Sequence, residues 1–378
     1  MKNNSETFSF KRLWVLILLP IAFIIIWQAK TNPEFCETYS KNIYPILSGS
    51  LNYLFSMTEI SIAQIILTVI AALLVFYTLT TILGLIFAGG RFKRILTYIV
   101  NIVCIFSMIV FFFSVTCGIN YYRPSFAETE GIEVTGATTK ELSELLSEIV
   151  LRINEAEENF DGNYRSFSEN AEIAAESIAK LSEKYPSLSG EYGNPKPVSF
   201  FGFMSMSRIT GFFFPFTYEA NVNETIPKIS IPSTMCHELA HLRGNMREDE
   251  ANFIAFLSCM QSGDPEFIYS GLMLAYSHTA SALNKYDPEL CRQIIDGLSD
   301  DVKKDISEKN KYWAKYEGPV AEISDSVNDL YLKANDQKDG VKSYGRMVDL
   351  LISEFRNNGL EIPKAEEETV EEEIETNE

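Results

Sequence analysis

The segment Ser233-Thr-Met-Cys-His-Glu-Leu-Ala-His-Leu-Arg-Gly-Asn-Met-Arg-Glu-Asp-Glu-Ala-Asn252 contains the pattern His-Glu-x-x-His at His237, Glu238 and His241. Residues four apart share one face of a helix, so both imidazoles can bind one metal ion while Glu238 lies beside its water. Because the chain has only three histidines, chance rarely produces this pattern. The segment therefore predicts a zinc-binding helix, and the alternative is a surface helix whose histidines bind nothing.

A third protein ligand is expected, because catalytic zinc sites usually have three and keep one position for water. Gly244 is predicted to end the first helix and Asn245 to cap the next one. On that next helix Glu248 and Asn252 lie four residues apart, so the amide can support a carboxylate ligand. We expect Glu248 to be the third ligand and Asn252 to lie beside the site.

Other assignments stay open at this point. Glu248 is instead the partner of Asn245 in a capping arrangement if it binds no metal. Glu250 is the alternative ligand, although it points to another side of the helix, and His278 is the third choice. Cys236 points about 100° away from His237 on a helix, so we do not expect it to be a ligand.

If the site is catalytic, Glu238 is expected to act as the general base when water attacks a peptide carbonyl. The oxyanion that forms needs a donor besides the metal ion. The residues to test for this role are His278, Tyr276, Tyr344 and Arg346, each of which also fits a packing or surface role.

The run His237-Glu-Leu-Ala-His241, followed by Glu248-Asp-Glu-Ala-Asn-Phe-Ile-Ala255, resembles the gluzincin type of zincin metallopeptidase. In that type a Glu on a following helix completes the zinc site, which implies one zinc ion per chain and hydrolysis of a peptide or protein. Two features depart from it. Only six residues separate His241 from Glu248, and Arg247 stands where the related metzincins carry a third His.

Three further segments extend the resemblance over nearly the whole chain. They are Asn120-Tyr-Tyr-Arg-Pro124, Glu219-Ala-Asn-Val-Asn223 and Ser343-Tyr-Gly-Arg346. Together with the apolar front of the chain, they resemble an uncharacterised bacterial family of zincin-like membrane proteins, a domain of unknown function. This resemblance implies an architecture and a metal site, and it names no substrate.

Charge is distributed very unevenly along the 378 residues. Residues 1–120 contain 8 Lys/Arg and 4 Asp/Glu, which gives +4, so the rest of the chain must carry −23 of the net −19. Such an acidic region repels phosphates, and we therefore expect no nucleic-acid partner. The six cysteines show no paired spacing that indicates a disulfide framework or a zinc knuckle.

Three apolar runs, at about 13–28, 62–87 and 95–117, predict a membrane region over residues 1–119 that partners the lipid bilayer. The second and third runs carry no charge, which argues against a transporter core. The first is short and contains Pro20, so a cleaved signal peptide is the alternative to an uncleaved helix. Gly89-Gly-Arg-Phe-Lys-Arg94 is basic, which places it in the cytoplasm and the C-terminal domain outside it.

Residues 120–364 predict one zincin-like domain of the α+β class, mostly α, and residues 365–378 an acidic disordered tail. Two Phe-rich stretches, 195–203 and 211–223, predict strands. Tyr218–Asn223, just before the metal helix, is the candidate for an edge strand that pairs with substrate, and the alternative is an ordinary core hairpin. An amphipathic helix is expected within 29–60, either at the membrane surface or packed on the soluble domain.

We therefore expect a membrane-anchored zinc metallopeptidase. The alternative is a catalytically inactive zincin-fold module that binds or senses at the cell surface.

Overall fold

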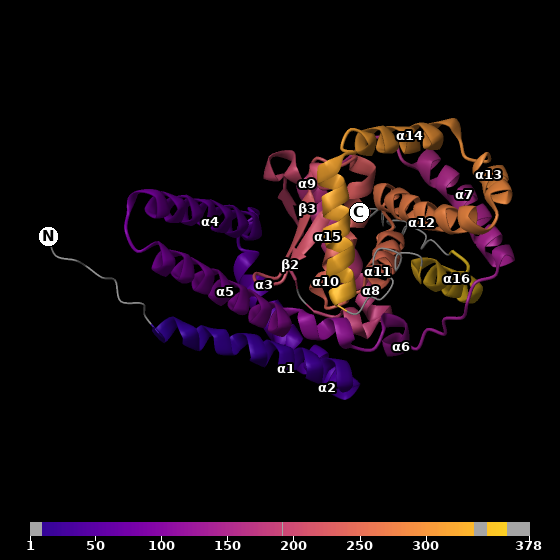
Figure 1. Ribbon diagram of the computed structural model, residues 1–378. Coiled ribbons are helices and arrows are strands. Elements are labelled where there is room, and N and C mark those ends of the chain that lie inside the picture. The colour runs from indigo at the N-terminus through magenta and orange to yellow at the C-terminus, as the bar shows by residue number, and fades with distance from the viewer. Residues whose placement is uncertain (1–9, 191, 336–345, 361–378) are drawn as a thin grey trace, which may run out of the picture.

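The computed structural model describes residues 10–190, 192–335 and 346–360, and it is mostly helical with one small sheet (Figure 1). The expected tail at 365–378 and Tyr344 lie outside these residues. The α+β class with a helical majority is confirmed.

Three helices are long and apolar enough to cross a membrane, which indicates membrane association. They are α1 (Leu18–Thr31), extended at its start by a 3₁₀ helix, α4 (Ile62–Phe87) and α5 (Arg91–Thr116). Figure 1 shows all three running away from the rest of the molecule. Gly90, at φ 75°, provides the left-handed residue that turns the chain from α4 into α5.

The segment between the first two apolar helices packs on the soluble part. It forms α2 (Pro33–Asn42) and α3 (Tyr44–Phe55). The Tyr44 hydroxyl donates to the carbonyl of Leu242 at 3.1 Å, and the Asn52 amide donates to the carbonyl of Tyr218 at 2.6 Å. The buried face of α3 therefore faces protein, which decides between the two placements that the sequence allowed.

The helices of the soluble part begin mostly at side-chain caps. Ser125, Thr138 and Ser166 each form a capping box with a Glu three residues on. These helices are α6 (Phe126–Glu130), α7 (Thr139–Asn159), α8 (Phe167–Lys184), α9 (Phe203–Met206), α10 (Ile231–Leu242), α11 (Glu248–Gln261), α12 (Pro265–Tyr286), α13 (Pro288–Ile295), α14 (Asp300–Ala314), α15 (Pro319–Ala334) and α16 (Arg346–Asn358).

The sheet contains β1 (Lys196–Val198), β2 (Gly211–Phe214) and β3 (Glu219–Asn223) in the order β1-β3-β2. β1 runs parallel to β3, and β2 runs antiparallel to it with Phe212 opposite Asn221. The prediction that Tyr218–Asn223 forms an edge strand was wrong, because β3 is central and β2 is an edge.

Buried polar contacts connect β3 with β1 and with the start of α4. The Glu219 carboxylate of β3 lies 2.6 Å from the Lys196 ammonium and accepts from the backbone N–H groups of Ile62 and Ala63 at the start of α4. Ser61 donates to the Asn221 side chain at 2.6 Å. Polar residues in this strand therefore anchor an apolar helix instead of facing solvent.

The end of the first Phe-rich stretch is also not a strand. Residues Phe200–Gly202 form a 3₁₀ turn that leads into α9. Phe200 at φ 42° and Gly202 at φ 81° both adopt left-handed backbone conformations that end the strand.

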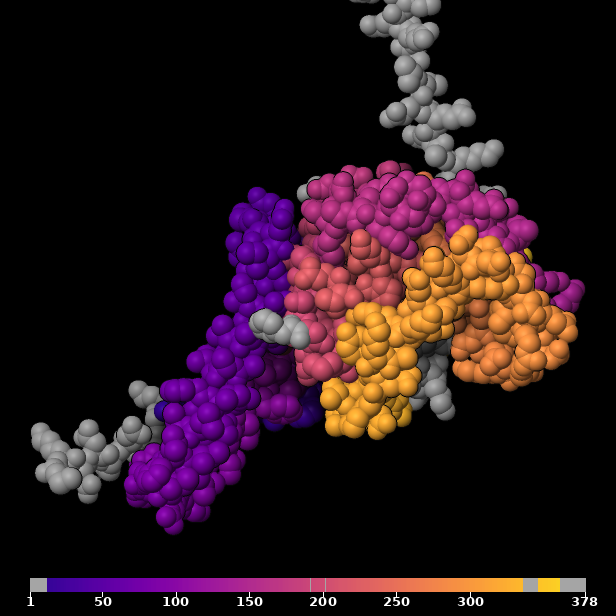
Figure 2. Space-filling view, turned by 90° about the horizontal axis from the view of Figure 1, so that it is seen from above, coloured from indigo at the N-terminus to yellow at the C-terminus, as the bar shows by residue number. Residues whose placement is uncertain are grey.

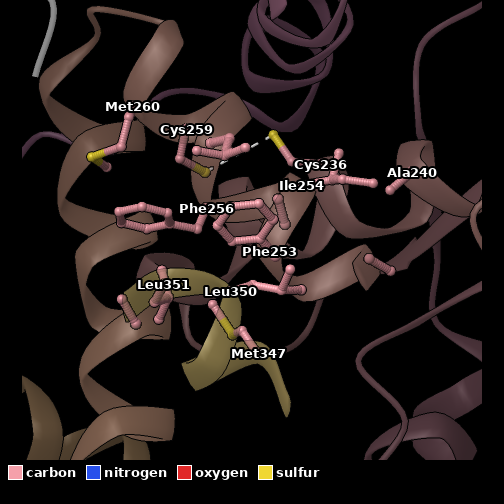
Figure 3. Packing of buried hydrophobic residues seen from close by; sticks show 14 of the residues in the cluster. Cys236, Ala240, Phe253, Ile254, Phe256, Cys259, Met260, Met347, Leu350 and Leu351 are labelled. Carbon is pink, nitrogen blue, oxygen red and sulfur yellow. Dashed lines mark hydrogen bonds between the residues drawn. The ribbon is translucent and has the colours of Figure 1, made fainter. Parts of the chain in front are cut away.

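The core lies behind α10, on the side away from its histidines. Figure 3 shows Phe253 and Phe256 of α11 packed between Cys236 of α10 and Leu350 and Leu351 of α16. Because α10 and α11 are both fixed by this core, the side chains on their other faces have defined positions.

Candidate metal centre

A tight turn between α10 and α11 brings their polar faces together. Gly244 adopts φ 88°, and a Cβ there would lie 2.9 Å from the side-chain nitrogen of Asn120. Only glycine meets both requirements without strain. Because α11 begins at Glu248, this carboxylate lies beside the histidines of the preceding helix.

His237, His241 and Glu248 form a cluster whose ligand atoms all lie within 4.8 Å of one another. Nε2 of His237 lies 3.3 Å from one carboxylate oxygen of Glu248, and Nε2 of His241 lies 3.7 Å from the other. Two imidazole nitrogens and a carboxylate are a donor set that zinc accepts. The cluster could therefore hold a metal ion.

Both imidazole rings are oriented through their other nitrogen. Nδ1 of His241 lies 2.8 Å from the backbone carbonyl of Asn245, and Nδ1 of His237 lies 2.9 Å from Oδ1 of Asn252. A carbonyl oxygen only accepts, so each Nδ1 carries a proton and each Nε2 faces the cluster, where it presents a lone pair when the ring is neutral. These hydrogen bonds hold both rings in an orientation that fits a metal ion.

The structure also places the alternative residues. Glu250 accepts from the N–H of Phe126 at 3.0 Å and pairs with Arg247 at 3.1 Å, away from the cluster. Asn245 does not cap α11, because the residue before this helix is Arg247. The buried side-chain amide of Asn245 has no hydrogen-bond partner in the part of the chain that the structure describes. The capping prediction for Asn245 was wrong because its backbone carbonyl, which binds His241, fixes its position.

Glu238 lies at the cluster but does not join it. Its side chain is buried, its Oε2 has no hydrogen-bond partner among the described residues, and its carboxylate accepts from the backbone N–H of Phe213. Burial raises the pKa of Glu238 to about 8, and the negative charge of Glu248 adds to this rise. A buried carboxyl group with a free oxygen and a raised pKa has the properties of a general base or acid.

The two histidines differ in basicity. Burial, together with the neighbouring His237, lowers the pKa of His241 to about 4. Burial also acts to lower the pKa of His237, but the hydrogen bond and charge of Glu248 raise it above its ordinary value. His241 is therefore neutral at pH 7, the form that binds a metal ion.

Strand β2 packs against Glu238. The N–H of Asn223 donates to the carbonyl of Thr210, and hydrogen-bonded pairs alternate along an antiparallel ladder. The backbone groups of Gly211 and Phe213 therefore point away from β3, toward the free edge. Phe213 uses its N–H for Glu238. Its carbonyl and both backbone groups of Gly211 lie at an edge that no other described strand pairs with.

A cleft of about 570 Å³ contains the cluster, Glu238 and the free edge of β2. Its other walls are α15 and the segment after α5. Tyr121 and Tyr331 line it together, with their hydroxyl oxygens 2.6 Å apart. Burial raises the pKa of Tyr121, and the neighbouring Tyr331 and the charge of Glu248 add to this rise.

Most of the proposed oxyanion donors lie elsewhere. His278 and Tyr276 belong to α12 and Arg346 begins α16, and none of them lines the cleft. Sequence reasoning missed Tyr121, Tyr331 and Gly211. Tyr121 lies directly after the third apolar run, in a segment whose residues fit an aromatic belt at the membrane surface. Tyr331 follows the histidine helix by more than 80 residues, and no sequence spacing predicts a contact over that distance.

Comparison with known proteins gives one family. The family model described as "Protein of unknown function (DUF3810)" matches residues 39–352. Neither a curated protein nor a solved structure matches the chain.

Proposed function

The chain belongs to the DUF3810 family, whose function is unknown, and we propose that it is a membrane-anchored zinc metallopeptidase with a zincin-like active domain outside the cytoplasm. The single observation that carries this proposal is the orientation of the two histidines. Both Nδ1 atoms are held by acceptors, and both Nε2 atoms face the carboxylate of Glu248.

In this proposal His237, His241 and Glu248 hold the zinc ion, and Glu238 is the general base. Zinc, when bound, lowers the pKa of water and polarises a carbonyl group. Glu238 takes the proton of the attacking water, because its Oε2 is free and buried beside the cluster. Its raised pKa makes the same carboxyl group a suitable proton donor to the leaving amine.

The free edge of β2 supports a peptide substrate. An extended peptide can pair with the backbone groups of Gly211 and the carbonyl of Phe213, which places its main chain beside Glu238. The hydroxyl of Tyr331, held by Tyr121, is the donor in this cleft that we assign to the oxyanion. The placement outside the cytoplasm rests on the basic connector between α4 and α5.

The test is a digest of a peptide library by the full-length protein in nanodiscs, with Glu238→Gln as the comparison. We expect cleavage by the wild type and a loss of at least about 10³-fold in Glu238→Gln, with zinc retained in both. Zinc without cleavage by the wild type favours a binding or sensing module. Full turnover in Glu238→Gln contradicts the general-base role.

A further inference from the structure

We propose that α15 lies in the headgroup layer of the bilayer, with an apolar stripe among the lipid chains, so that the cleft takes peptide segments that are themselves held at the membrane surface. The placement of α15 is independent of any enzymatic activity. The choice of substrate rests on the proposed function.

The apolar stripe is exposed along the whole of α15. Val320, Ile323, Val327 and Leu330 recur at a spacing that puts them on one side of the helix, and they are 46%, 65%, 61% and 69% exposed. Glu322, Asp329 and Lys333 lie on another side. Only Ala321 and Leu332 of this helix are buried. Such an amphipathic helix, with its apolar side facing outward, is typical of a helix at a membrane interface.

The position of α15 relative to the apolar helices favours the bilayer as its partner. The ring of Tyr331 lies 6.2 Å from the ring of Phe113, near the end of α5, so the C-terminal end of α15 meets α5 where that helix ends. In Figure 2, α15 (light orange) lies at the lower edge of the soluble part, on the side where the far ends of α4 and α5 also lie. The stripe is thus continuous with the region that the apolar helices indicate as membrane.

A second exposed apolar group lies on α9, directly before the segment from Ser207 to Gly211 that lines the cleft. Phe203 and Met206 of α9 are 56% and 42% exposed. The segment that follows them is joined to α15, since Ser324 donates to the carbonyl of Ser207 at 2.8 Å. Two exposed apolar groups on elements that contact each other fit a single lipid surface better than two separate protein partners.

Two segments outside the described residues have little apolar sequence with which to cover the stripe. Residues 336–345 contain one aliphatic and one aromatic residue, and residues 365–378 are dominated by Glu. The helix itself carries three acids and one lysine, so its attraction to lipid comes from apolar area and not from charge. Zwitterionic lipid is therefore a sufficient partner.

The stripe and the cleft share a border. Val327 belongs to the stripe and also lines the cleft, as does the adjacent Tyr331. Phe113, at the end of α5, lines the opposite side. A peptide bond reaching the cluster past α15 must lie at the level of the lipid headgroups, which identifies the substrate as the juxtamembrane segment of a membrane-anchored polypeptide.

Single-cysteine labelling tests the placement of α15. All six native cysteines are buried, so a new exposed cysteine can be labelled selectively. Val320→Cys, Ile323→Cys and the control Glu322→Cys, on the polar side of the same turn, are labelled with an environment-sensitive fluorophore. The full chain is then placed in phosphatidylcholine nanodiscs.

We expect doxyl-lipid quenchers to quench the first two labels and iodide to quench the control. Equal quenching by iodide at all three positions overturns the proposal. Shielding from iodide without quenching by doxyl lipid, seen only with two copies in a disc, also overturns it in favour of a dimer.

A pair of peptides tests the substrate class. One peptide sequence cleaved by the wild type is offered free and with an acyl anchor, and we expect kcat/KM to be at least about tenfold higher for the anchored form. Ile323→Glu should abolish this advantage and leave hydrolysis of the free peptide unchanged. Equal rates for both forms overturn the substrate class. If neither form is cleaved, the proposed function fails, and the labels alone decide the placement of α15.

Discussion

Gly211 of β2 lies directly against the carboxylate of Glu238 of α10. A Cβ at position 211 would be 2.6 Å from Oε1 of Glu238 and 2.9 Å from the backbone carbonyl of Asn221. The carbonyl cannot move without breaking the sheet, so the carboxylate would have to shift. The edge strand therefore sets the position of the proposed general base.

Gly211→Ala should lower kcat by about 10–100-fold, since a small displacement of a catalytic group is costly. Zinc content should not change, because Gly211 does not contact the three cluster residues. Gly136→Ala is the control, since a Cβ there meets nothing within 4 Å and its backbone is not left-handed. Wild-type turnover in Gly211→Ala would show that Glu238 is not held by β2.

Asn252→Ala should weaken zinc binding by about 10–100-fold, because His237 loses the acceptor that orients its ring. Asn252→Asp keeps an oxygen at this position and should bind zinc about as well as the wild type. Competition with a fluorescent chelator measures both affinities. Equal weakening in the two variants would contradict an orienting role for the side-chain oxygen.

Metal-free Glu238→Gln should be more stable than the metal-free wild type at alkaline pH. The ordinary pKa of a glutamate carboxyl is 4.5, and burial raises that of Glu238 to about 8. From pH 4.5 upward the unfolded chain ionises first, so this group progressively destabilises the fold until pH 8. The gain from Gln should be absent at pH 4, grow between pH 4.5 and 8, and reach a few kcal/mol.

Thermal melting of the full-length protein with a chelator, from pH 4 to 9, measures this difference. A constant difference between the two proteins across that range would show that the pKa of Glu238 is not raised.

Lys196→Met should destabilise the protein by about 3–5 kcal/mol, since it leaves the buried Glu219 carboxylate without its cation at the start of α4. Lys333→Met removes an exposed pair with Asp329 and should cost less than about 1 kcal/mol. Adding Glu219→Gln to Lys196→Met should recover part of the loss. Equal melting temperatures for the two single variants would contradict the anchoring role of this pair.

The sequence predicted the elements whose signal is local. The His237–His241 spacing, the glycine turn at Gly244 and the apolar helices each depend on neighbours in the chain, and the structure contains all of them. The chain also belongs to a family of unknown function, as expected, whereas the zincin-like character of that family stays a prediction.

Features that depend on tertiary contacts were misread or missed. β3 was expected to be an edge because it lies just before the metal helix, whereas it pairs with both β1 and β2, and Lys196, Ser61 and the start of α4 satisfy its polar side chains. Tyr331 reaches the cleft only because α15 crosses it, and the sequence of α15 alone resembles any amphipathic helix. Asn245 was assigned to a cap because its residue type suits one, although its carbonyl binds His241.

The most direct measurement of the central claim is the metal content of the purified full-length protein, its Glu248→Gln variant and its Glu250→Gln variant. The proposed site predicts about one zinc per chain in the wild type and in Glu250→Gln, and none in Glu248→Gln. A wild-type protein that stays metal-free after expression with ample zinc would contradict it, as would equal zinc content in all three proteins.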